Sequence, residues 1–204
     1  ESLGSPRELL EVMLGRAGAT LQSEADLAVA IKRDGPDTKA LLAELASRGS
    51  AVHDDKSQRW LHVDALESGL EEVLAAIGRW FDANPLRELI EVRELRNELG
   101  HDAALLAFLL DEGQTRGSVE VLPGGKLRLP GRELQVDPET RALVERLEAR
   151  LEEAVFQPPS APELASELGT TPKALAPVLS MLVDGGRIVP LGGELYLAAA
   201  HAEA

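Results

Sequence analysis

Two basic side chains in the last third of the chain, Lys173 and Arg187, have the type and placement to contact a nucleic-acid backbone. Lys173 falls in the first turn of a predicted helix, and Arg187 opens the predicted hairpin that follows it. Basic residues at such positions pair with phosphate groups in helix-turn-helix proteins. The equivalent helices upstream have fewer basic side chains for such contacts. One has Lys39, and the other, His101–Glu112, has no lysine or arginine. Lys173 and Arg187 are therefore the candidate nucleic-acid contacts.

Other residue patterns that carry chemistry are missing from the sequence. The chain has no cysteine, which excludes disulfides and thiolate metal sites. Pro123-Gly124-Gly125-Lys126 resembles part of a phosphate loop, but it lacks the leading glycine and the Ser or Thr after the lysine, so we interpret it as a turn. The histidines are widely separated and show no ligand spacing: His53, His62, His101 and His201. We predict no catalytic residue, no metal site and no cofactor in this chain, and hence no enzyme.

The charge of the chain argues against an extended nucleic-acid-binding face. Asp and Glu number 35 against 21 Lys and Arg, which gives a formal net charge of −14. A nucleic-acid-binding domain usually carries a basic face that displaces counterions from phosphates. Here even the last third has five basic and eleven acidic side chains. We therefore expect the modules to act as spacers or to contact proteins, and not to recognise a nucleic-acid sequence.

The cellular compartment is predicted from two features that the sequence does not show, a membrane span and a signal peptide. No apolar run reaches the roughly 18 residues of a membrane span, and no signal peptide opens the chain. We therefore expect a cytoplasmic protein without membrane contact. The chain begins Glu-Ser without an initiator Met, which suggests a piece of something longer.

The stretch from Pro158 to Ala198 is predicted to form one compact unit. Ser160 and Thr171 each cap a helix, and a proline follows within the first turn of both. Two short strands come next, joined by a two-residue turn at Gly192-Gly193. The predicted elements are helices over 161–168 and 172–184 and strands over 187–191 and 194–198. With a first helix supplied by Pro138–Phe156, this is a winged helix-turn-helix module.

The same pattern occurs three times at an even spacing. Leu-rich helix, glycine and β-branched strand follow one another in LLAELASRGSAV, LLAFLLDEGQTRGSV and LAPVLSMLVDGGRIV. In the second of these, Gly113 is expected to end the helix. The sequence therefore predicts a mainly α protein with small β-hairpin wings, made of tandem winged helix-turn-helix modules over residues 1–66, 67–134 and 135–204.

Two groups of residues resemble a known family. The run Trp80–Arg87, followed by Glu94-Leu95-Arg96, resembles the second winged-helix module of the bacterial selenocysteine-specific elongation factor, SelB. Phe156–Ser160, Glu163-Leu164-Ala165 and the closing Glu194–Leu197 resemble its third module. The resemblance extends over the whole chain and depends on the order of the motifs and the number of modules.

The resemblance implies a role in translation. The family delivers selenocysteinyl-tRNA to the ribosome at recoded UGA codons, with an N-terminal GTPase and four tandem winged helices, of which the distal ones grip an mRNA hairpin. This chain matches modules one to three. The principal hairpin-binding residues belong to the fourth, so none of them can be assigned here. GTP would be a ligand of the parent protein only.

We therefore expect a monomeric arm that spaces the GTPase and tRNA-binding part from the hairpin-binding module. In this interpretation the mRNA hairpin is bound through a fourth module that this chain lacks, and the ribosome and selenocysteinyl-tRNA are partners of the parent. The alternative is a DNA-associated tandem winged-helix protein, such as a transcriptional regulator or a chromosome-segregation subunit. Sequence running upstream into a GTPase would favour the first interpretation, and a basic reading helix would favour the second.

Overall fold

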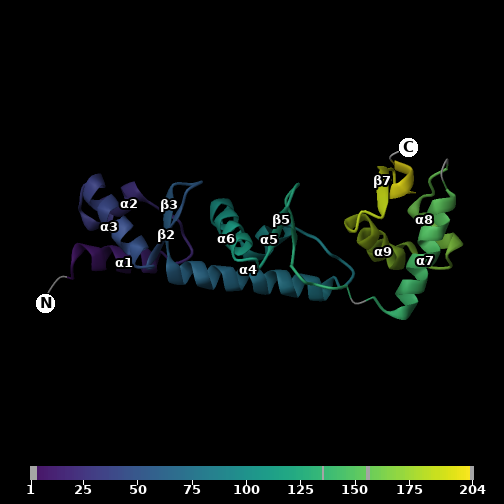
Figure 1. Ribbon diagram of the computed structural model, residues 1–204, viewed down its shortest axis with the longest axis horizontal. Helices are drawn as coiled ribbons and strands as arrows, with labels where there is room; N and C mark the ends of the chain where they lie inside the picture. The colour runs from purple at the N-terminus through teal and green to yellow at the C-terminus, as the bar shows by residue number, and fades with distance from the viewer. Residues whose placement is uncertain (1–3, 135, 155–156, 203–204) are drawn as a thin grey trace. The chain divides into compact units, whose positions relative to one another are not determined.

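The computed structural model describes residues 4–134, 136–154 and 157–202 (Figure 1). By contacts within the chain they form two compact units. The first unit contains residues up to Gly78 together with Glu91–Leu127, and the second contains Arg79–Ile90 together with residues from Arg128 onward. Each unit is described by itself below.

The first unit begins with three capped helices and a hairpin. Ser5, Ser23 and Asp34 cap the helices by accepting a hydrogen bond from a backbone N–H in the first turn. Strand β1 pairs with β3, which pairs with β2, so the residues just before the second helix extend the hairpin into a three-stranded sheet. The elements are α1 (Pro6–Ala17), β1 (Gln22–Ser23), α2 (Glu24–Ile31), α3 (Gly35–Ser47), β2 (Ala51–Asp54) and β3 (Arg59–His62). Their shared core contains Leu10, Leu14, Leu27, Ile31, Leu42, Leu45 and Ala51.

The next elements repeat this order. The strand order β4-β6-β5 again places the residues before the second helix beside the second strand of the hairpin. The elements are α4 (Val63–Ala83), β4 (Ile90–Glu91), α5 (Val92–Leu99), α6 (Ala103–Thr115), β5 (Glu120–Leu122) and β6 (Lys126–Arg128). The predicted helix over His101–Glu112 is therefore shifted, because the Asp102 carboxylate caps it by accepting from the N–H of Ala104 at 2.9 Å.

Gly113 does not end α6, contrary to the sequence prediction. The helix continues to Thr115, and the turn that follows has Gly117 at φ +70°, with its N–H on the carbonyl of Gln114. Gly113 is buried, and a Cβ built on it would lie 2.8 Å from Val119 Cγ1. The glycine is required for close packing of the helix against the chain that enters β5, while Gly117 supplies the left-handed turn.

The last elements begin with three capped helices. Asp137, Ser160 and Thr171 cap α7 (Pro138–Glu153), α8 (Ala161–Glu167) and α9 (Pro172–Asp184), each with proline in the first turn. Ser160 caps α8, as predicted, and it forms a complete capping box with Glu163. Strands β7 (Ile188–Gly192) and β8 (Leu195–Ala198) and the short α10 (Ala199–Ala202) follow. Residues 155 and 156, at the predicted end of the first helix, lie outside the described residues.

The predicted Gly192-Gly193 turn is wrong by one residue. Gly192 pairs with Leu195, so the turn is made by Gly193 and Glu194, both at positive φ. Pro190 pairs with Tyr196, which leaves Leu191 as a bulge between the two pairs. Ser160 forms an isolated bridge with Leu195, in the place that β1 and β4 take in the other sheets.

These arrangements confirm the predicted fold class, which is mainly helical with small antiparallel hairpins. The three sets of elements share one order of helices and hairpin. The module boundaries at 66–67 and 134–135 stay a prediction. In the part of the chain that the structure describes, every helix is too short or too polar to span a lipid bilayer.

Candidate nucleic-acid interface

Lys173 lies in the first turn of α9, as the sequence predicts. Thr171 Oγ1 accepts a hydrogen bond from the N–H of Ala174 at 3.2 Å, which fixes the start of the helix just before the lysine. Lys173 is exposed. Within residues 4–134, 136–154 and 157–202 it has no ion pair, so its charge is available to a partner.

Arg187 lies at the base of the wing, just before β7, rather than inside the predicted strand. Its N–H donates to the carbonyl of Leu182 at 2.8 Å, and its carbonyl accepts from Ala199 at 3.0 Å. The guanidinium forms an ion pair with Glu148 of α7, and 53% of the side chain is exposed. Part of its charge is therefore neutralised before any ligand binds.

The structure does not bring the two candidates together. Lys173 is at the start of α9, and Arg187 follows its end. A helix of 13 residues spans roughly 20 Å at about 1.5 Å per residue. The two side chains therefore cannot bind one phosphate group, and each would make a separate contact.

The first turns of the equivalent helices in the first unit are acidic or apolar. Asp34 caps α3, with Asp37 in its first turn beside Lys39. Asp102 caps α6, whose next residues are Ala103 and Ala104. Carboxylates at a helix start satisfy the free backbone N–H groups and occupy the place where a phosphate would bind. These two helices are therefore poorly suited to contact a nucleic-acid backbone.

Many arginines in both units are held by carboxylates of the same unit. The nearby carboxylates raise the pKa of the arginines by hydrogen bonding in three pairs, Arg7–Glu44, Arg116–Glu67 and Arg150–Glu167. Arg116 is bidentate, with both Nη atoms 2.8 Å from the two carboxylate oxygens of Glu67. These three arginines are therefore already paired with carboxylates of their own unit at the surface.

The histidines and carboxylates of the described ranges do not form a metal site. No group of three or more His, Asp or Glu side chains there could hold a metal ion. The histidines have separate local partners: His53 lies 2.7 Å from Asp55, and His101 lies 3.4 Å from Glu72.

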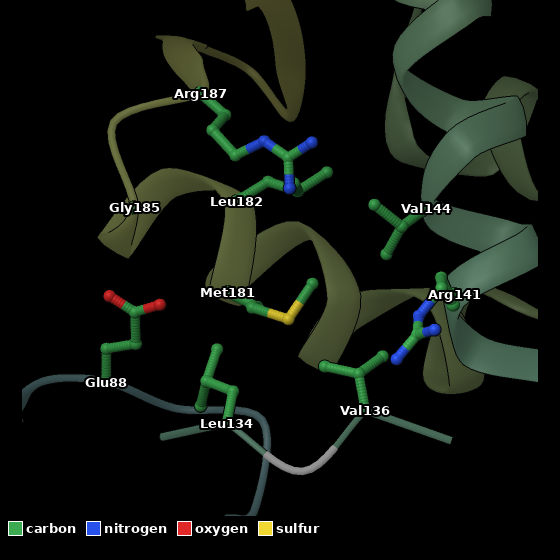
Figure 2. A pocket seen from close by; sticks show the side chains of 9 residues that line it. All are labelled: Glu88, Leu134, Val136, Arg141, Val144, Met181, Leu182, Gly185 and Arg187. Atoms are coloured by element: carbon green, nitrogen blue, oxygen red, sulfur yellow. The ribbon is translucent and has the colours of Figure 1, made fainter. Parts of the chain in front are cut away.

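Sequence reasoning missed one cation. Arg141, in the second turn of α7, is exposed and lines a pocket that Arg187 also lines (Figure 2). Its neighbours at helical spacing, Asp137 and Glu145, suggest an ordinary surface charge pair. Since the pocket is closed by α9 and by the loop at Glu88, no local sequence signal could reveal it.

The repeated order of three helices and a hairpin defines a tandem winged-helix protein. Over 194 residues, 94% of its length, the chain is 25% identical to the selenocysteine-specific elongation factor of Desulfomicrobium baculatum. This confirms the resemblance predicted from the sequence. The chain spans only 30% of the length of that relative.

A solved structure and the protein-family models give two further comparisons. A solved structure of the mRNA-binding domain of elongation factor SelB from E. coli, in complex with SECIS RNA, matches with 18% identity and a TM-score of 0.25. The match covers 63% of this chain and 97% of that one. No protein-family model matches the chain.

Proposed function

We propose that this chain is the connecting arm of a selenocysteine-specific translation elongation factor. It would space a GTPase and tRNA-binding part from a module that binds an mRNA hairpin. The observation that carries the proposal is the similarity to a selenocysteine-specific elongation factor along almost the whole chain. GTP, the ribosome and selenocysteinyl-tRNA would be bound by other parts of the parent protein, in the cytoplasm, with the arm as a monomer.

The electrostatics support a spacer more than a reader of RNA. The net charge is −14. The starts of α3 and α6 carry aspartates, and Arg187 is held by Glu148. Lys173 and Arg187 together could neutralise about two phosphates, which limits the slope of log K against log salt to about −2.

A titration of the 204-residue chain with the parent's labelled mRNA hairpin tests this function. Fluorescence anisotropy at two salt concentrations should show weak binding with a shallow salt dependence. A chain extended through a fourth winged helix should bind tightly, with a steep salt dependence. Nanomolar binding by the 204-residue chain would contradict the spacer function. Binding of duplex DNA, with no binding of the hairpin by either chain, would favour a DNA-associated protein instead.

A further inference from the structure

A pocket of about 240 Å³ in the second unit combines an apolar floor with two arginines. It lies between α7, α9 and the loop at Glu88 (Figure 2). The lining residues that matter here are Glu88, Arg141, Val144, Met181, Leu182 and Arg187. All of them belong to the same compact unit.

The floor of the pocket is part of the hydrophobic core. Val144 and Met181 are each 6% exposed, and Leu182 is fully buried. These residues come from α7 and α9 and pack in one cluster. The floor is therefore held in place by the fold and does not depend on a ligand. The methionine thioether adapts to an aromatic partner and makes favourable sulfur–aromatic contacts.

The two arginines reach the pocket from different elements. In Figure 2, Arg141 lies on the α7 side of the pocket and Arg187 lies above Met181. Val144 lies between the two arginines. Among the described residues Arg141 has no ion pair, whereas Arg187 is paired with Glu148. The charged residues that line the pocket are Arg141, Arg187 and Glu88, and Glu148, the partner of Arg187, is not among the lining residues.

We propose that this pocket binds one unpaired nucleotide of an RNA strand. The base would lie on Met181 and Val144, and the phosphates on either side of it in the strand would be held by Arg141 and Arg187. Unpaired bases are bound on apolar, aromatic or guanidinium surfaces, and arginine recognises phosphate through a planar fork of donors. The proposal rests on the proposed function only in that a translation factor works among RNA strands.

A nucleotide fits these groups better than an acidic peptide does. An Asp or Glu side chain would satisfy one guanidinium but leave the apolar floor uncovered. A nucleotide carries a flat apolar surface and an anion in one unit, which matches the two kinds of lining residue. A base-paired helix is excluded by the same logic, because its bases are stacked inside and cannot reach a floor of buried side chains.

The experiment is an NMR titration of the whole 204-residue chain, with the Met181 methyl group and the backbone amides as probes. The ligand is a uridine hexamer at low salt. Shifts should concentrate at Met181, Val144 and Gly185. Arg141→Gln should weaken binding about tenfold or more, the effect of losing a charge-assisted hydrogen bond to phosphate. Arg150→Gln is the matched control, since Arg150 lies on the same helix but is bonded to Glu167, outside the pocket.

A second variant tests the sign of the electrostatics. Glu148→Gln releases Arg187 from its ion pair and should tighten binding of the hexamer several-fold. Because Glu148 is not among the residues that line the pocket, a merely structural role for it would not produce this gain. An unchanged amide spectrum outside the pocket would show that both variants fold.

Several results would overturn the proposal. One is binding of the hexamer that ignores Arg141→Gln, or shifts that leave Met181 untouched. Another is equal binding of a tyrosine–aspartate peptide that shares the response to Arg141→Gln, which would make this a peptide site. Equal binding of uridine monophosphate would replace the RNA strand by a free nucleotide. None of these measurements involves the mRNA hairpin or a GTPase, so their failure is distinct from failure of the proposed function.

Discussion

Arg87 Nε donates a hydrogen bond to Asp184 Oδ2 over 2.7 Å, joining two residues 97 positions apart in the sequence. The Asp184 side chain is 6% exposed and the Arg87 side chain 30%. The guanidinium also lies 5.6 Å from the ring centre of Trp80. Leu86, next to Arg87, packs on the core of α7, α8 and α9. Residues 79–90 thus belong to the same compact unit as α9.

Arg87→Ala should strongly destabilise this second unit. It leaves the nearly buried Asp184 carboxylate without its ionic partner, which typically costs about 3–5 kcal/mol for a buried pair. Trp80 reports the event locally, so urea unfolding is followed by its fluorescence in a Trp60→Phe background. Arg150→Ala is the control, because Arg150 belongs to the same unit and its pair with Glu167 is 33% and 44% exposed, so this pair should contribute less than about 1 kcal/mol. Equal effects of the two variants would contradict the importance of the Arg87–Asp184 bond.

Leu182→Ala should destabilise the same unit by about 2–5 kcal/mol, the range for truncated core leucines. Leu182 is fully buried at the end of α9, as its helical spacing from Leu175 and Leu179 predicts. Leu191→Ala is the matched control, since Leu191 is 50% exposed on the wing. Chemical denaturation of both variants measures the difference. A loss below about 0.5 kcal/mol for Leu182→Ala would show that its burial contributes little.

Local structure was predictable from sequence wherever a short signal has one meaning. The serine, threonine and proline signals at Ser160, Thr171 and Pro172 determine where α8 and α9 begin, because capping depends on residues only three positions apart. Glycine is less informative. Gly113 was predicted to end a helix, yet it is there to avoid a clash with Val119, and a glycine needed for packing looks the same in a sequence as a glycine that stops a helix.

The candidate site could be proposed only in part from the sequence. Lys173 and Arg187 could be named because each lies beside a helix cap or a hairpin signal, and their contact with a nucleic acid stays a prediction. Arg141 was missed, since the pocket that it lines is formed by chain segments about 40 or more positions apart, such as Arg141, Met181 and Glu88. The Arg87–Asp184 bond could not be predicted either, because its residues are 97 positions apart in the sequence. The sequence also could not show that Glu148 would hold Arg187, because a helix surface offers several carboxylates at similar spacing.

The Asp54 carboxylate should make the first unit sensitive to acid. It is 5% exposed at the turn between β2 and β3. Burial raises the pKa of Asp54, but hydrogen bonds from Ser57 Oγ and from the N–H groups of Lys56 and Ser57 outweigh it, so the pKa lies below its ordinary value. A lowered pKa stabilises the fold above about pH 4, the unfolded pKa, and this contribution disappears as the pH falls through the folded pKa.

Asp54→Asn should therefore lower the free energy of unfolding by about 1–3 kcal/mol near neutral pH and flatten its fall in acid. Urea unfolding between neutral and acidic pH, followed by Trp60 fluorescence, measures both effects. Asp55→Asn is the control, because the Asp55 side chain is 94% exposed. An acid profile of Asp54→Asn that runs parallel to that of the unaltered chain would rule out Asp54 as the group responsible.

Two glycines on neighbouring helices should respond to alanine with opposite signs. Gly78 lies inside α4 with no atom within 4 Å of a Cβ built on it, so Gly78→Ala should stabilise by about 0.5–1 kcal/mol through helix propensity. Gly113 lies inside α6 with Val119 Cγ1 only 2.8 Å from such a Cβ, so Gly113→Ala should destabilise by about 1–3 kcal/mol through overpacking. Adding Val119→Ala to Gly113→Ala should recover part of the loss, because it removes the clashing methyl group. Denaturation midpoints of the three variants test the prediction, and a stabilising Gly113→Ala would mean that the chain entering β5 moves away at little cost.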